Sequence, residues 1–193
     1  NIIEHRIVLI NSNFLYLCGR KVKFMTNYLE ELNESQRNAV LYNEGPSLVI
    51  AGAGNSGTDK VFYPAKYKDV IGVGAIDGDM TVAWYSEYGE GIDVLAPGGN
   101  QEGSGEYNRP EIWGVYSTYP NGGDAYSAGT SMACPHVSGV AALIVSHFGG
   151  EGFTAEECKK RLLNGYRPMG GLIPDDQLGD IGVGLLDAAA ALM

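Results

Sequence analysis

One serine stands where a protein could use its hydroxyl as a nucleophile. Ser131 directly follows Gly129 and Thr130, and an apolar stretch lies a little further along, at residues 140–145. This pattern predicts a helix that begins near Ser131 and runs through the apolar stretch. Backbone N–H groups and the positive end of the helix dipole would then face the hydroxyl, which favours a developing oxyanion. A serine at this place could also serve only as the N-cap of the helix.

The residues around this serine resemble one protease family. Residues 127–139 read Ser-Ala-Gly-Thr-Ser-Met-Ala-Cys-Pro-His-Val-Ser-Gly, and they are similar to the nucleophile segment of subtilisin-like serine proteases, the subtilases. Four more segments resemble the same family in the family's order: 53–57, 63–75, 92–98 and 182–188. The resemblance implies that residues 51–193 form the C-terminal half of a catalytic domain that cleaves peptide bonds, with Ser131 as the nucleophile.

The resemblance also implies roles for residues near the cleft. The side-chain amide of Asn55 would hold the oxyanion. The pocket for the substrate side chain that precedes the cleaved bond would be lined by Gly52, Ala53, Gly54, Tyr63 and Pro64. Such small residues would leave room for a large apolar group unless other loops fill the space. The glycines could equally form only a tight exit from a strand.

The other two members of a catalytic triad have no match in the sequence. A subtilase triad runs Asp, His, Ser along the chain, and no Asp-Ser-Gly, Asp-Thr-Gly or His-Gly-Thr-His segment occurs. On a helix, His136 would point away from Ser131, and His147 would lie about 24 Å along the same helix. The third histidine, His5, lies in an unrelated segment. We therefore expect the isolated chain to be inactive.

A second resemblance covers residues 25–54, which are similar to the start of UvrD/Rep-type DNA helicases. A glutamine placed like Gln36 contacts adenine in that family, and the stretch 51–54 opens a phosphate-binding loop. Gly52 and Gly57 have the spacing of such a loop, but Thr58-Asp59 stands where a lysine and a hydroxyl residue are needed. We therefore expect no useful ATP binding.

The two resemblances overlap at residues 51–54, which indicates a chimeric chain. Its predicted parts are an unassigned segment at 1–24, a helicase-like fragment at 25–54 and a subtilase-like half-domain at 51–193. Besides a serine endopeptidase, two other functions stay open: a fragment of an ATP-dependent DNA helicase, and a non-catalytic interaction module.

Composition limits the partners. The chain has 193 residues, a net charge of −10 and 45% hydrophobic residues, which is typical of one globular domain and disfavours nucleic acid or an anionic membrane as partner. Cys18, Cys134 and Cys158 have neither disulfide nor metal spacing, so we predict no metal and no cofactor. The family resemblance implies an extracellular or cell-envelope location, although no export signal and no membrane span is recognisable.

Alternating strands and helices predict an α/β fold. Helices are expected at 26–31, 34–42, 131–148, 154–163 (opened by Thr154) and after Asp187, and strands at 47–51, 70–75 and 92–95. Residues 98–123 show no periodicity, and we expect this stretch to lie near the substrate cleft. The resemblance implies a partial subtilisin-like parallel sheet with flanking helices, from which the N-terminal strands are missing. This would leave a sheet edge exposed for a covering partner.

Overall fold

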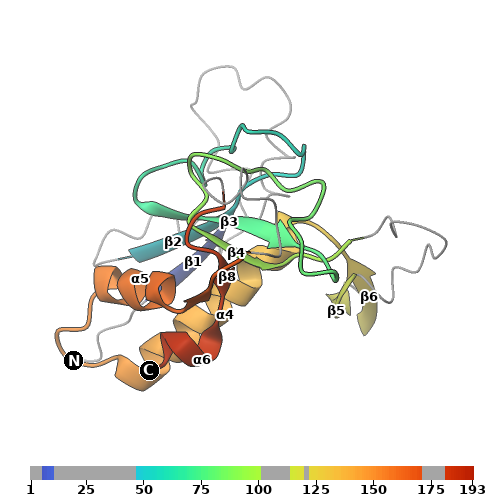
Figure 1. Cartoon of the computed structure of the whole chain (residues 1–193). Helices are drawn as coiled ribbons and strands as arrows, with labels where there is room; N and C mark the ends of the chain where they lie inside the picture. The colour runs from blue at the N-terminus through green and yellow to red at the C-terminus, as the bar shows by residue number, and fades with distance from the viewer. Residues whose placement is uncertain (1–5, 11–46, 101–113, 120–121, 171–180) are drawn as a thin grey trace, which may run out of the picture.

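A six-stranded sheet forms the centre of the molecule (Figure 1). The computed structural model describes residues 6–10, 47–100, 114–119, 122–170 and 181–193, and the helices predicted at 26–31 and 34–42 lie outside these ranges. The strand order is β1-β2-β3-β4-β8-β7, in which β7 is antiparallel to β8 and all other neighbours are parallel. The strands are β1 (Arg6–Ile10), β2 (Ser47–Gly52), β3 (Val70–Ile76), β4 (Val94–Pro97), β7 (Tyr166–Arg167) and β8 (Leu185–Leu186).

The central strands are short apolar runs, and every residue of β3 is buried. Parallel strands that are covered on both faces have this composition. The strands predicted at 47–51 and 70–75 are confirmed. The third begins two residues later than predicted, because Asp93 precedes it: the Asp93 N–H donates to the Gly72 carbonyl, and the Asp93 carboxylate accepts from the Gly72 N–H.

One face of the sheet is covered by helices. In Figure 1, α4 (Thr130–Phe148), α5 (Ala155–Asn164) and α6 (Ala188–Ala191) lie together below the strands. Buried α4 residues recur every three or four positions, which is the spacing of one helix face; they include Ala133, Val137, Ala141 and Ile144. The helix is long and apolar enough to cross a membrane, and in this fold it is the core helix beneath the sheet.

The opposite face is covered by connecting segments. The second buried cluster joins sheet residues to the loops around Val61 and Ala65 and to two residues near the C-terminus, Met169 and Ile181. Both faces of β2–β4 are therefore protected from water, as a parallel sheet requires.

The predicted α/β fold, a parallel sheet with flanking helices, is confirmed, and one further strand lies beside β2 where an open edge was expected. Residues 6–10, in the segment left unassigned from the sequence, pair in parallel with residues 47–51. After Arg6, the strand reads Ile-Val-Leu-Ile, a run of branched apolar residues that favours a strand. The edge that was expected to be open at β2 is therefore paired, and in the described ranges β1 and β7 are the two edge strands of the sheet.

A two-stranded hairpin precedes α4 and projects away from the sheet (Figure 1). Its strands are β5 (Val115–Tyr119) and β6 (Gly123–Ser127). The prediction that residues 98–123 lack regular structure is thus wrong for 115–119. Most hairpin residues are exposed, so the strands lack the alternation of buried and exposed positions on which the prediction depended. Residues 101–113 lie outside the described ranges.

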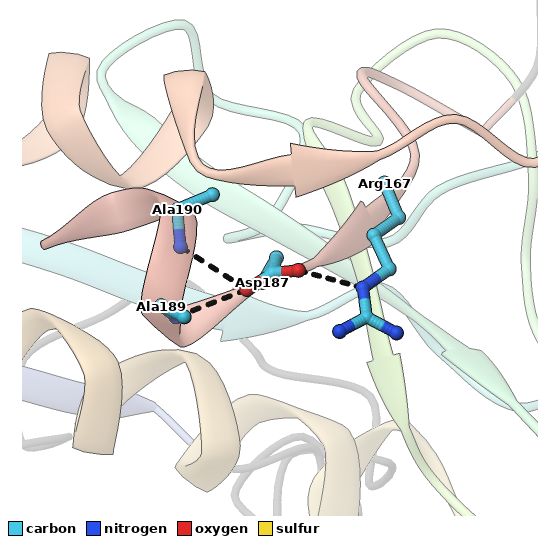
Figure 2. A network of polar contacts seen from close by, with 4 residues as sticks. All are labelled: Arg167, Asp187, Ala189 and Ala190. Atoms are coloured by element: carbon cyan, nitrogen blue, oxygen red, sulfur yellow. Dashed lines mark hydrogen bonds and ion pairs between the residues drawn. The ribbon is translucent and has the colours of Figure 1, made fainter. Parts of the chain in front are cut away.

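The predicted helix caps at the C-terminal end are confirmed. The Thr154 hydroxyl accepts a hydrogen bond from the Glu157 N–H at the start of α5. Asp187 caps α6 by accepting from the N–H groups of Ala189 and Ala190, and it also accepts from Nε of Arg167 at 2.6 Å (Figure 2). Because Arg167 belongs to β7, this network ties the last helix to the edge of the sheet.

Candidate functional site

The start of α4 places Ser131 in the first turn of a helix. Gly129 is the N-cap and has φ 148°, a conformation that favours glycine, and Thr130 is the first helical residue. The interpretation of Ser131 as the N-cap is therefore wrong, and its prediction as a first-turn residue is confirmed. No acidic residue lies in this first turn, so no side-chain charge there offsets the positive end of the helix dipole. Ser131 is 5% exposed.

Asn55 lies against this helix terminus. Its carboxamide oxygen accepts one hydrogen bond from the backbone N–H of Thr130 at 2.8 Å and one from the Thr130 hydroxyl at 3.0 Å. Since a backbone N–H can only donate, the atom that faces it must be the oxygen, and this fixes the orientation of the carboxamide. The Nδ2 group is then the donor end of an exposed side chain, where it can donate to an incoming oxygen.

The end of β2 approaches α4 closely. A Cβ on Gly52 would lie 3.0 Å from both the carbonyl oxygen and the hydroxyl of Thr130, so glycine permits this approach. The next contact is a hydrogen bond of 3.3 Å from the Gly54 N–H to the Thr130 hydroxyl. The loop that carries Asn55 and the turn that carries Ser131 therefore meet through Thr130.

The residues predicted to line the pocket have close neighbours in the fold, and Gly54 is the most tightly packed of them. Gly54 has φ 123°, and a Cβ there would lie 2.3 Å from a ring carbon of Phe62 and 2.8 Å from Cγ of Glu87. Ala53 is fully buried. Tyr63 precedes a cis peptide bond to Pro64, and its exposed ring packs on Tyr67. Phe62 from the following loop therefore lies directly beside Gly54, which is the alternative of a loop filling this space that the sequence left open.

Glu87 is a site residue that sequence reasoning missed. Its side chain is completely buried, and its carboxylate accepts from the N–H groups of Ser56 at 2.8 Å and Thr58 at 2.7 Å and from the Thr58 hydroxyl at 2.8 Å. In the sequence, Glu87 is a single charged residue in the stretch Trp-Tyr-Ser-Glu-Tyr, and nothing distinguishes it from a solvent-exposed glutamate in a loop. Burial of a carboxylate by amide groups from a distant loop leaves no local sequence pattern.

Tyr85 stabilises the turn before α4 through the backbone of Gly98 and Gly99. Its hydroxyl donates to the Gly99 carbonyl at 2.6 Å, and the neighbouring Gly98 carbonyl accepts from the Gly129 N–H at 3.0 Å. Burial raises the pKa of Tyr85 above its ordinary value, so the hydroxyl stays protonated and able to donate. Gly98 could not carry a side chain here, because a Cβ would lie 2.4 Å from that of Ala75.

Two histidines lie in the described part of the chain, and each has a partner on its own helix. Nδ1 of His136 lies 2.8 Å from the carbonyl oxygen of Met132, one helical turn earlier. The ring of His147 packs edge-on against Phe148, at the far end of α4 from Ser131. His5 lies outside the described residues. The contacts described for these two histidines are thus with residues of α4 other than Ser131.

Cysteines and metal ligands add no chemistry to the described residues. Burial raises the pKa of the Cys134 thiol to about 12 and that of Cys158 to about 11, as expected for small buried residues. Within residues 6–10, 47–100, 114–119, 122–170 and 181–193, no group of three or more His, Cys, Asp or Glu side chains could hold a metal ion.

Comparisons with known proteins agree on one family. Residues 18–180 match the Peptidase_S8 profile, described as the subtilase family. M-protease from Shouchella clausii (strain KSM-K16) is 45% identical over 97 residues, which are 50% of this chain and 22% of that protein. Among solved structures, the prenylagaramide maturation protease PagA has a TM-score of 0.62 and 32% identity, over 76% of this chain and 50% of that one.

A further solved structure is the epidermin leader peptide processing serine protease (EpiP) from Staphylococcus aureus. It has a TM-score of 0.64 and 27% identity, over 76% of this chain and 40% of that one. The chain thus spans about half or less of the length of the relatives it matches. The family match nevertheless covers most of its residues, and the chain belongs to the subtilase family of serine proteases.

Proposed function

We propose that this chain supplies the nucleophile and one oxyanion donor of a subtilisin-like serine endopeptidase. The observation that carries the proposal is the contact of Asn55 with Thr130, because it puts a fixed amide donor beside the helix turn that carries Ser131. Ser131 Oγ would attack the scissile carbonyl carbon, and the Asn55 Nδ2 group would donate to the oxygen that becomes negative. The dipole of α4 would add to this stabilisation.

We propose that the base for Ser131 comes from a segment outside these 193 residues. In the Ser-His-Asp mechanism, the histidine takes the serine proton and then gives it to the leaving amine, and the aspartate orients the histidine. Neither histidine of the described residues is placed for this, and the sequence holds no triad motif for the other two members. We propose that the chain hydrolyses no peptide until a polypeptide segment with the aspartate and the histidine packs beside it.

The edge strand β1 is where such a segment would join the sheet. Its outer side is one of the two sheet edges in the described residues, and an edge strand offers a row of backbone donors and acceptors to a further strand. This is the covering partner that the sequence predicts. The substrate would be a peptide or a protein, and the family resemblance implies an extracellular or cell-envelope location.

The helicase-like origin of residues 25–54, and with it the division of the chain at 24 and at 51–54, stays a prediction. The subtilase profile runs across this segment, from residue 18. Against ATP binding, the amide groups of the glycine loop that a phosphate would need are bonded to the Glu87 carboxylate.

Reconstitution tests the proposed function. The full chain would be refolded with the N-terminal part of an active subtilisin that ends after the catalytic histidine, and complex formation would be measured by light scattering. We expect the complex to cleave a chromogenic peptide and the isolated chain not to. A complex with the Ser131→Ala chain should form equally well without turnover. A stable complex that shows no turnover would contradict the proposal and favour a non-catalytic interaction module.

A further inference from the structure

We propose that Glu87 is a positioning residue that holds the Asn55 loop (residues 54–58), and through it the amide donor of Asn55. The inference rests on the proposed function of Asn55 and names a second residue on which that function depends. The buried Glu87 carboxylate accepts three hydrogen bonds from this loop.

The two carboxylate oxygens of Glu87 accept hydrogen bonds from residues on either side of Gly57. Oε1 accepts from the Ser56 N–H at 2.8 Å, and Oε2 accepts from the N–H and the hydroxyl of Thr58 at 2.7 and 2.8 Å. Ser56 directly follows Asn55, so the first of these bonds fixes the peptide group next to it. Gly57 lies between Ser56 and Thr58 and has φ 64°. This backbone conformation turns the N–H groups of both neighbours to the same side of the loop.

The segment that carries Glu87 is itself fixed. Its backbone bonds to the loop three times: the Glu87 N–H donates to the Gly54 carbonyl, the Gly57 N–H to the Tyr85 carbonyl and the Tyr88 N–H to the Thr58 carbonyl. The Ser86 hydroxyl accepts from the Ala75 N–H at 2.9 Å, which anchors the same segment to β3. The loop is therefore held by a segment that is itself anchored to the sheet.

Only a carboxylate fits this position. An ionised glutamate accepts hydrogen bonds and donates none, and the groups that face its two oxygens all donate here. A glutamine of the same shape would put its NH₂ group against an N–H or a hydroxyl. Among the ion pairs of the described residues none includes Glu87, so amide and hydroxyl groups carry the compensation of its charge.

The arrangement also accounts for the resemblance of this loop to a phosphate-binding loop. Glycine-rich loops cradle phosphates with backbone N–H groups, and residues 52–57 have the glycine spacing for it. Here the anion is part of the protein. The bound carboxylate makes the loop rigid, and Asn55 is thereby fixed at two places: its backbone by Glu87 and its carboxamide oxygen by Thr130.

Amide hydrogen exchange of the full chain tests the first half of the inference. Ser56 is exposed in the fold, so slow exchange of its N–H would come from the Glu87 bond. In Glu87→Gln we expect the Ser56 and Thr58 amides to exchange at least about tenfold faster, the α4 amides to be unchanged, and the Asn55 side-chain amide signals to shift. Glu90→Gln, the same change at an exposed glutamate three positions on, should alter none of these signals. Unchanged exchange and unchanged Asn55 signals in Glu87→Gln would overturn the inference.

If Glu87→Gln does not fold, a milder change at Thr58, on the other side of the same hydrogen bonds, tests the inference. Thr58→Val removes one of the three donors from a partly exposed residue and keeps its shape, and Thr58→Ser keeps the hydroxyl. We expect the Asn55 amide signals to shift in the valine variant and not in the serine variant. The inference would be overturned if the Asn55 amide signals had the same positions in the valine and the serine variants.

Kinetics of the reconstituted complex test the second half. Glu87→Gln should lower kcat by about tenfold or more with little change in KM, and should cost little further rate when Asn55 is already alanine, because both act through one donor. A rate that falls in Asn55→Ala but not in Glu87→Gln would overturn this inference alone. A rate that Asn55→Ala leaves unchanged would contradict the proposed function itself.

Discussion

The carboxamide oxygen of Asn55 accepts a hydrogen bond of 2.8 Å from the backbone N–H of Thr130, although 75 positions separate the two residues. This bond joins the loop after β2 to the first turn of α4. Each element alone is common in α/β proteins. Their contact places an amide donor beside a first-turn serine, and it is the geometric basis of the site.

The Thr130 hydroxyl should contribute measurably to stability. It donates to Asn55 and accepts from Gly54, and Thr130 is fully buried. Thr130→Val keeps the shape but removes the acceptor of the buried Gly54 N–H, so the free energy of unfolding should fall by about 1–3 kcal/mol. Thr130→Ser keeps the hydroxyl and loses one methyl group, at a cost of about 1 kcal/mol. Denaturant unfolding of both variants is the measurement. A serine variant less stable than the valine variant would refute the role of the hydroxyl.

Loss of the oxyanion donor should affect the rate rather than the fold. In the reconstituted complex, Asn55→Ala should lower kcat, and the loss of about 10²–10³ already measured for the oxyanion asparagine of subtilisin, a member of this family, sets the expected size. KM should change little, because the amide acts on the charge that develops during attack. Steady-state kinetics measure both constants. An equal loss through KM alone would mean that Asn55 binds substrate without stabilising the oxyanion.

Asp93 should make the chain less stable as the pH rises. Burial raises the pKa of Asp93 in the folded state, and the hydrogen bond from the Gly72 N–H offsets this only in part. The folded state then binds the proton more tightly than the unfolded state, so stability falls from the ordinary aspartate pKa up to the raised one. Asp93→Asn can still accept from Gly72 and should remove this fall. Unfolding followed between acidic and neutral pH measures it.

Asp187 serves as a control, because its pKa is shifted in the opposite direction and it should make the chain more stable as the pH rises. The hydrogen bond from Arg167 lowers the pKa of Asp187, so its contribution is present above the ordinary aspartate pKa and is lost as the pH falls. Asp187→Asn should therefore flatten the acid side of the stability curve. If both asparagine variants changed the pH dependence in the same direction, the assignment of these two groups would be wrong.

The cysteines of the core should be inert in the folded chain. With a pKa of about 12 for Cys134 and about 11 for Cys158, only a small fraction of either thiol is ionised at about pH 8, and both side chains are buried. Iodoacetamide should modify neither residue in the native chain and both in denaturant, as mass spectrometry of the peptides would reveal. Modification of native Cys134 would contradict the packing of α4 on the sheet.

The glycine loop should not bind ATP. Its Ser56 and Thr58 amides are engaged by Glu87, and Thr58-Asp59 replaces the lysine and the hydroxyl residue of a phosphate loop. Calorimetry with Mg-ATP should give no heat of binding. Micromolar binding that is lost in Lys60→Ala would restore the helicase interpretation of this segment.

The sequence was most informative where one local pattern decides a structure. Strand runs such as 70–75, the cap residues Thr154 and Asp187, and the helix after Gly129 could all be predicted, because each depends on residues close together in the chain. The position of Ser131 in the first helical turn follows from the same kind of pattern.

The parts that were missed depend on contacts between distant segments. β1 is a short branched run whose strand character is decided by its pairing with β2, and the exposed β5–β6 hairpin has no buried face to give a period. Glu87 and Phe62 have their roles because they contact the loop of residues 54–58. Glu87 is about 30 positions away from this loop in the sequence, and Phe62 lies in the segment that directly follows it. Propensity and spacing contain no information on such pairs.

Covalent labelling of Ser131 tests the central claim most directly. A fluorophosphonate reacts with a serine that a neighbouring base activates, and peptide mass spectrometry locates the adduct. We expect rapid, single modification of Ser131 in the reconstituted complex and none in the isolated chain over the same time. Modification of the isolated chain at the same rate would mean that these 193 residues contain their own base, and a complex that is active but labelled at another serine would mean that Ser131 is not the nucleophile.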